Sequence, residues 1–297
     1  MANTKELRHR IKSVKTTQQM TKAMKMVAAA KLRRAQDNIT NLRPYAVKLN
    51  EIMGNLAANV GGEIDSPYAS TQAPEKVLLV VITSNRGLCG AFNTNVNKEA
   101  LRVIKEHYTA QEAAGNLEIL AVGKKAYDFF SKRNYKVVED KNHDVFANLS
   151  FESVNEVGSM VMEGYVAGRW NRVDLIFNEF VNVMSQERTH EQFLPIAATP
   201  PAEGDTGSTS DYIFEPSMAE ILEDLIPKSL RTQFFKAVLE TNAGEQGARM
   251  VAMDNATTNA EDLLKELKLA YNQARQAAIT TEILEIVAGA EALASAS

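Results

Sequence analysis

The sequence predicts an α/β protein in which helices from the two ends of the chain form a long antiparallel two-helix coiled coil, with a separate α/β domain between them. Both end segments, from Leu7 and from Phe235, carry a repeat with alternating steps of four and three residues. A spacing of 3.5 residues held over about seven heptads is typical of a left-handed coiled coil. In the middle of the chain, strand-like and helix-like segments alternate, which is the pattern of an α/β domain.

The first helix is predicted over residues 3–60, within an N-terminal coiled-coil segment of residues 1–62. It contains no glycine before Gly54. We expect Pro44 to bend this helix rather than end it, because the repeat continues beyond the proline. A glycine pair then stops the helix, and residues 61–75 are expected to form a linker.

Residues 73–200 are predicted to fold as a Rossmann-like α/β domain with a mostly parallel sheet. The segment from Lys76 to Thr83 is apolar at successive positions, as in a strand that is buried on both faces of a parallel sheet. Alternating strands and helices favour parallel pairing. The elements expected after it are a helix over 95–108, a strand over 117–122, a helix over 124–133, a strand over 135–138, a helix over 152–170 and a strand over 172–180.

The C-terminal coiled-coil segment is predicted over residues 211–297. A connector rich in proline, glycine and hydroxyl residues, 199–210, precedes it. Pro216 is expected to open the helix because proline is tolerated in a first turn, and Pro227 marks a second bend.

Polar residues within the two repeats predict how the helices align. If the polar positions of one helix meet those of the other, paired residue numbers sum to about 271, because polar seam residues are known to set register. This register leaves the last residues, from 269 on, as an unpaired and alanine-rich overhang of about 40 Å. A lone helix of that length is marginal in water, so we expect a partner to surround it. The register residues are Gln18, Thr21, Lys25, Asn242, Gln246 and Arg249.

Positive charge is concentrated at the start of the chain. The net charge is −4, but residues 1–48 carry twelve Lys or Arg against Glu6 and Asp37. Such a run is either a solvated helix face or a surface for an acidic protein or for nucleic acid. The basic segment holds a single aromatic residue, Tyr45, for base stacking. A nucleic-acid partner is therefore not expected.

The turn from Ser84 to Asn93 follows a strand and precedes a helix, which is where a phosphate loop would lie. It matches neither GxGxxG nor the Walker A pattern, so a structural turn is favoured over the site of a nucleotide enzyme. Cys89 is the only cysteine and has no histidine nearby in sequence, which favours a packed side chain over a nucleophile. We expect no catalytic residue, cofactor or metal in this chain.

Three methionines, Met20, Met24 and Met26, lie among the lysines of the first helix. A methionine stripe on a helix usually packs in a core. Met20 and Met24 lie off the strict repeat, however, and methionine also suits adaptable protein contacts. Both interpretations remain open.

Four segments resemble one family, the gamma subunits of F-type ATP synthases. Residues 279–292 match that family's C-terminal signature. Residues 21–31, 86–93 and 249–256 are similar to its other hallmarks. The segments are spread over the whole chain, and the match is of the bacterial type. The paired-cysteine insertion of chloroplast relatives is absent, so thiol regulation is not expected.

The resemblance implies a non-catalytic rotor shaft. It implies that the chain couples ion flow through a membrane c-ring to ATP synthesis or hydrolysis in an α3β3 hexamer. The implied partners are the α and β subunits, the epsilon subunit and the c-ring. The implied location is the cytoplasmic face of the cell inner membrane, as a peripheral protein held there by the complex.

The resemblance also assigns roles to individual residues. Met24 and Lys25 match positions that touch an acidic lever of the β subunit, whereas Arg275 and Gln276 match positions that meet a loop of the hexamer. Asn85 replaces a common aspartate of the family, so we expect an ion pair to be lost there. The residues expected to contact the α and β subunits are Met24, Lys25, Lys31, Arg275, Gln276 and Glu282.

Overall fold

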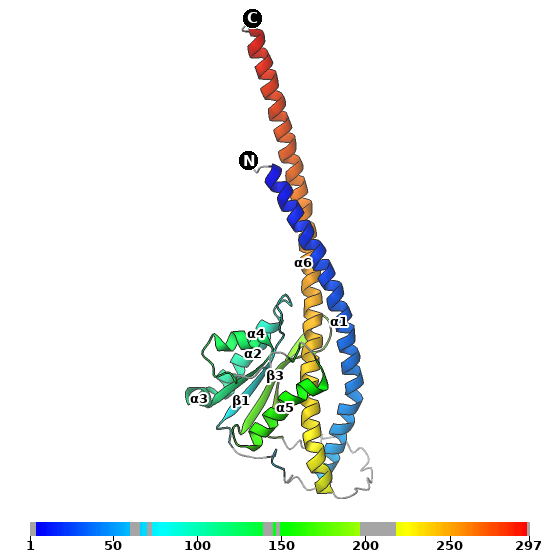
Figure 1. The fold of residues 1–297 in the computed structure, drawn as a ribbon, viewed down its shortest axis with the longest axis vertical. Coiled ribbons are helices and arrows are strands. Elements are labelled where there is room, and N and C mark those ends of the chain that lie inside the picture. The colour runs from blue at the N-terminus through cyan, green and yellow to red at the C-terminus, as the bar shows by residue number, and fades with distance from the viewer. Residues whose placement is uncertain are drawn as a thin grey trace. The chain divides into compact units, whose positions relative to one another are not determined.

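The computed structural model describes residues 4–59, 66–69, 73–138, 145–146, 149–196 and 218–295. They form two compact units. The first unit consists of Met1–Ala28 with Met250–Ser297, and the second of Ala29–Arg249. Two long helices, α1 (Thr4–Asn59) and α6 (Met218–Ser295), contribute residues to both units (Figure 1). The division into segments 1–62, 73–200 and 211–297 stays a prediction.

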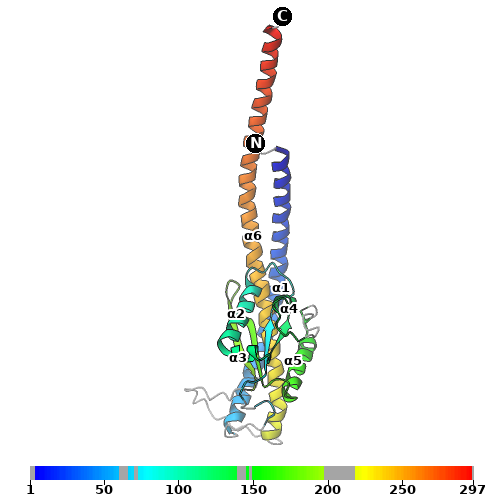
Figure 2. The same cartoon turned by 90° about the vertical axis from the view of Figure 1, so that its left-hand side faces the viewer.

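In the first unit, α1 and α6 lie side by side and antiparallel (Figures 1 and 2). Every repeat position of α1 from Leu7 to Ala28 is buried or half-buried. The same holds on α6 from Met253 to Ala274. The predicted 3–4 repeat is therefore confirmed as the contact face of this coiled coil.

The predicted register of the coiled coil is wrong. The hydroxyl oxygens of Thr21 and Thr257 lie 2.8 Å apart, and Arg8 Nη2 donates to Tyr271 Oη at 2.8 Å. Lys25 and Asp254 form an ion pair. In each of these three pairs the two residue numbers sum to 278 or 279, whereas the predicted register requires 271. The shift is about one heptad. A shift of seven residues leaves the same positions in the seam, so the repeat alone does not distinguish the two registers.

The corrected register also shortens the overhang of α6. Its predicted start at residue 269 is wrong, because Tyr271 still pairs with α1. From Arg275 to Glu291 every side chain is exposed, and the helix continues to Ser295. Among the described residues, no helix combines the length and the apolarity that crossing a bilayer requires.

The second unit contains a four-stranded sheet with strand order β2-β1-β3-β4. Strand β1 pairs in parallel with both β2 and β3, whereas β4 runs antiparallel to β3. This confirms a mostly parallel sheet. The strands are β1 (Val77–Ile82), β2 (Leu117–Val122), β3 (Arg172–Phe180) and β4 (Gln186–Leu194).

Helices cover both faces of the sheet. On one face, α2 and α4 pack against Val77, Leu79 and Val81 of β1. On the other face, α5 and the part of α6 from Leu222 to Val238 pack against the alternate β1 residues. Thus α6 is also a core helix of the α/β domain. The shorter helices are α2 (Phe92–His107), α3 (Thr109–Ala113), α4 (Lys124–Ser131) and α5 (Phe151–Val166).

Two details of the sheet differ from the prediction. The expected strand over 135–138 is reduced to a single parallel bridge between Val137 and Ile119 beside β2. Strand β4 was not predicted, because only its last residues, Phe193 and Leu194, are buried and its other positions are polar.

Element boundaries differ by a few residues at helix ends. The predicted helix over 152–170 ends at Val166, ahead of Gly168 with φ 71°. Pro44 and Pro227 both lie inside helices. The predicted connector 199–210 and Pro216 lie outside the described residues, as does most of the predicted linker 61–75.

Candidate functional site

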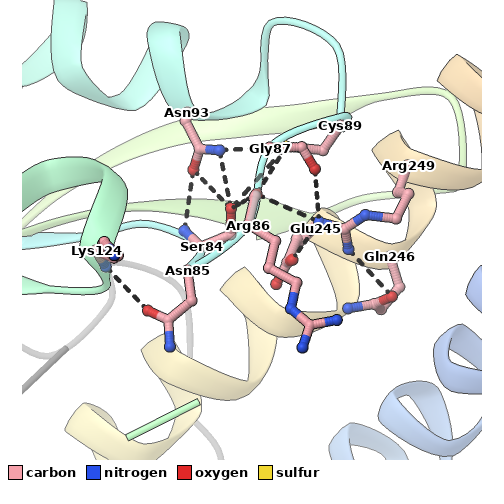
Figure 3. A network of polar contacts seen from close by, with 10 residues as sticks. All are labelled: Ser84, Asn85, Arg86, Gly87, Cys89, Asn93, Lys124, Glu245, Gln246 and Arg249. Carbon is pink, nitrogen blue, oxygen red and sulfur yellow. Dashed lines mark hydrogen bonds and ion pairs between the residues drawn. The ribbon is translucent and has the colours of Figure 1, made fainter. Parts of the chain in front are cut away.

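The turn between β1 and α2 is held by its own side chains (Figure 3). The backbone N of Ser84 donates to Asn93 Oδ1 at 2.9 Å, and Asn93 Nδ2 donates to Ser84 Oγ at 2.8 Å. Ser84 Oγ in turn donates to the carbonyl oxygen of Arg86 at 2.7 Å. Leu88 adopts φ 63° and leaves its side chain exposed. These contacts give the turn a structural role, which is the interpretation that the sequence favoured.

Asn85 has a defined partner in this turn. Its Oδ1 accepts a hydrogen bond from the backbone N of Lys124 at 2.9 Å, at the first residue of α4 (Figure 3). The first N–H groups of a helix lack partners within the helix, so a side-chain oxygen stabilises them. An amide oxygen serves here as a carboxylate oxygen would. Asn85 therefore caps this helix end through its side-chain oxygen, without a negative charge.

Arg249 on α6 joins the helix to the turn. Its Nη2 donates to the carbonyl oxygens of Arg86 at 3.3 Å and Gly87 at 3.2 Å, and lies 2.6 Å from Glu245 Oε1. Its Nη1 donates to Gln246 Oε1 at 3.3 Å (Figure 3).

Gln246 and Arg249 were predicted to set the coiled-coil register with Thr21 and Lys25. That pairing is wrong, because Thr21 and Lys25 bond to other α6 residues.

Burial governs the electrostatics of this network. Burial raises the pKa of Glu245, and the charges of Arg249, Lys31 and Arg86 act against that rise. Burial also raises the pKa of the Cys89 thiol. A raised thiol pKa disfavours the thiolate that a nucleophile needs. Cys89 is buried, as the sequence predicted for a packed side chain.

A second buried carboxylate belongs to Asp174 on β3, which is fully buried. Its oxygens lie 2.7 Å from Arg172 Nε and 2.7 Å from His190 Nε2, and Tyr108 Oη donates to it at 2.5 Å. Burial acts to raise the pKa of Asp174, but the hydrogen bonds from His190 and Tyr108 and the charge of Arg172 outweigh it and lower the pKa. This network was not predicted from the sequence, because its members come from separate elements of the fold.

The residues predicted to contact α and β subunits lie on the surfaces of the two long helices. Lys25 is half-buried and its Nζ lies 2.6 Å from Asp254 Oδ1, within the coiled coil. Met24 is half-buried. The other predicted contact residues are exposed: Lys31, Arg275, Gln276 and Glu282. Of the other predicted register residues, Gln18 and Asn242 are half-buried.

Large apolar side chains are exposed on both helices. Met20 and Met26 are 60% and 61% exposed, so these two do not pack in a core and the contact-surface interpretation is favoured for them. On the overhang, the exposed apolar residues are Ile279, Ile283, Leu284, Ile286 and Val287. Apolar residues grouped in this way indicate a surface that another protein covers.

Within the described part of the chain, no three His, Cys, Asp or Glu side chains gather in the manner of metal ligands. The polar clusters of the second unit join elements of the fold to one another. The surface features of the first unit are charged and apolar side chains on long helices. These are features suited to contact with other proteins.

Comparison with known proteins gives full-length matches. A family model described as ATP synthase matches residues 3–293. The ATP synthase gamma chain of Cytophaga hutchinsonii is 50% identical over 294 residues, and that of Prosthecochloris aestuarii 49% identical over 293, each alignment covering 99% of both chains.

Solved structures show the same fold. The central stalk and c-ring structure of the Tetrahymena thermophila mitochondrial ATP synthase contains a chain that matches with a TM-score of 0.56 and 26% identity, covering 80% of this chain and 99% of that one. A chain of the Euglena gracilis mitochondrial ATP synthase matches with a TM-score of 0.62 and 24% identity, covering 98% and 94%.

Proposed function

The chain belongs to the ATP synthase gamma-chain family, and from this premise we propose that it is the central stalk of an F-type ATP synthase. As a rotor shaft, it couples ion flow through a membrane c-ring to ATP synthesis or hydrolysis in an α3β3 hexamer. The observation that supports this best is the overhang of α6. Its exposed side chains from Arg275 to Glu291 include five large aliphatic residues, and a lone helix of this kind is marginal in water. A surrounding sleeve of protein would stabilise it.

The coiled coil has different charges on its two helices. Residues 4–28 of α1 carry seven Lys or Arg and one Glu, whereas residues 250–274 of α6 carry four Asp or Glu and two Lys. A rod with such a cross-section presents a different face to each of three surrounding β subunits. A partner shifts a conformational equilibrium only if it contacts the alternative conformations differently. The three β subunits would therefore adopt different conformations, and rotation of the rod would change the conformation of each β subunit in turn.

Specific contacts follow from the proposed role. Met24, Lys25 and Lys31 face the acidic levers of the β subunits. Arg275, Gln276 and Glu282 contact the hexamer near the upper part of the shaft. The exposure of four of these side chains and the half-burial of Met24 and Lys25 support the assignment.

The remaining partners are the epsilon subunit and the c-ring. The chain is part of a membrane-associated complex, and we place it at the cytoplasmic face of the inner membrane. It is held there by the complex. The bacterial origin of its full-length relatives supports this location.

A reversible cross-link tests the shaft function. Ala288 lies in the exposed overhang, so Ala288→Cys can bond to a cysteine placed in the surrounding α subunit after Cys89→Ser removes the native thiol. In the assembled complex, oxidation is expected to stop ATP-driven ion pumping, and reduction should restore it. Local unwinding of α6 would expose its backbone to proteases near Ala277. Full coupled activity with the bond intact and without such protease sensitivity would contradict a rotating shaft.

A further inference from the structure

Between Glu240 and Arg249, α6 meets the loops and strand ends at one edge of the sheet. Glu240, which is 1% exposed, accepts a hydrogen bond through Oε2 from the backbone N of Phe180 at 3.1 Å. Phe180 is the last residue of β3. A buried helix side chain thus binds the end of a central strand directly.

Two glycines on the same helix face allow close approach. A Cβ at Gly244 would lie 3.1 Å from Phe92 Cε2 and 3.3 Å from Gln186 Cγ, at the starts of α2 and β4. A Cβ at Gly247 would lie 3.4 Å from Phe180 Cε2 and 3.5 Å from the carbonyl oxygen of Val183. Residues 240, 244 and 247 follow steps of four and three, so they share one face of the helix.

Arg249 adds hydrogen bonds to this helix face, and we call the whole set of contacts the collar. Arg249 binds the carbonyl oxygens of Arg86 and Gly87. The charges of α1 also reach the collar, because Arg43 acts on the pKa of Glu240 and Lys31 on that of Glu245. The collar consists of Glu240, Gly244, Glu245, Gly247 and Arg249 of α6 with Arg86, Gly87, Phe92, Phe180, Val183 and Gln186 of the α/β domain.

We propose that the collar is a torque joint, which prevents α6 from turning about its own axis relative to the α/β domain. The inference rests on the proposed shaft function. The close-packed apolar core around α6 from Leu222 to Val238 resists such turning sterically, and the collar adds directional contacts to it. The collar resists turning because hydrogen bonds are directional. Each residue advances a helix by about 100°, so turning α6 would also carry a side chain into the space that the glycines leave for Phe92.

The test places a wedge in the joint. Gly244→Leu keeps a strong helix former on α6 but forces a side chain against Phe92, and Gly244→Ala is the milder wedge. Gly158→Ala on α5 is the matched control, because Gly158 lies outside the collar and its Cβ would meet Phe234 of α6 at an ordinary distance of 3.6 Å. Each variant is assembled into the complete ATP synthase, and ions pumped per ATP hydrolysed are measured in vesicles. Amide exchange at Phe180, whose N–H binds Glu240, reports on the joint in the isolated chain.

We expect Gly244→Leu to lower the ratio of pumping to hydrolysis while hydrolysis continues, with faster exchange at Phe180. Gly244→Ala should show a smaller loss, and Gly158→Ala none. A variant that is merely less stable lowers the number of complexes, and so lowers pumping and hydrolysis together. An unchanged ratio in both Gly244 variants, with the wild type coupled normally, would overturn the joint alone. A wild-type assembly that hydrolyses ATP without pumping would instead overturn the shaft function, and the joint with it.

Discussion

Lys25 of α1 and Asp254 of α6 form an ion pair across the coiled coil, with 2.6 Å between Nζ and Oδ1. The two side chains remain 40% and 54% exposed. The residue expected to face an acidic lever of the β subunit therefore already holds an acidic partner within its own chain. Any contact with the β subunit must share or replace that pair.

A charge exchange separates these two roles of Lys25. Lys25→Glu places two carboxylates opposite each other and should lower ATP-driven pumping, whereas Lys25→Glu with Asp254→Lys restores the internal pair. An exposed pair contributes about 0.2–1 kcal/mol, so the stability of the isolated chain should change little. If the outward charge matters, the double variant stays impaired in vesicle pumping assays. Full recovery would show that only the internal pair is needed.

The corrected end of the coiled coil predicts a boundary in hydrogen exchange. Backbone amides from residue 275 to 295 should exchange fast in the isolated chain, because this part of α6 has no α1 partner. In the assembled complex they should exchange slowly, because the hexamer surrounds this part of the helix. Residues 253–271 should be protected in both states. Mass spectrometry of peptic fragments measures this. Equal protection of the two segments in the isolated chain would contradict the register described above.

The buried network around Asp174 predicts acid sensitivity. Its lowered pKa means that it stabilises the fold above its ordinary pKa of 3.8, and this stability is lost as pH falls through the lowered value. Tyr108→Phe removes one donor, which should cost about 1–3 kcal/mol at pH 7 and move the acid loss to higher pH. Urea unfolding at several pH values tests this, with exposed Tyr45→Phe as the control.

Glu240 should show the opposite dependence. Burial raises its pKa, so the folded state binds the proton more tightly and stability falls as pH rises from the ordinary value of 4.5 through the raised value. Glu240→Gln keeps an acceptor for Phe180 and removes the buried charge. We expect this variant to unfold at a higher temperature than the wild type at pH 8, with the difference shrinking towards pH 4. A variant less stable at pH 8 would show that the hydrogen bond from Phe180 and the attraction of Arg43 together outweigh the cost of burying the charge.

Asn85 offers a test of the helix contact at α4. Asn85→Ala removes the acceptor for Lys124 N and should cost about 1 kcal/mol, whereas Asn85→Asp should be at least as stable as the wild type. Chemical denaturation of the isolated chain measures both variants. Equal loss in both would contradict the role assigned to the side-chain oxygen.

Local pattern was enough to predict most elements. The repeat from Leu7 identified the buried face of α1, because which residues share a helix face depends only on helical geometry. The apolar run of β1 predicted burial on both faces, which the two core clusters confirm. Strand β4 escaped prediction because an edge strand with polar positions carries little apolar signal. The family was also evident, because its motifs are local stretches of sequence.

Contacts between segments that are distant in the sequence could not be predicted from local patterns. Sequence alone predicted that the two long helices form a coiled coil and, from Leu7 to Ala28 and from Met253 to Ala274, which positions face its seam. Only the tertiary structure decided the register, because registers that differ by one heptad bury the same positions and are separated by specific pairs such as Thr21 with Thr257. It also decided that Arg249 binds the turn at Gly87 instead of the seam. Residues 162 positions apart in the chain meet there through backbone carbonyls, which no side-chain pattern encodes.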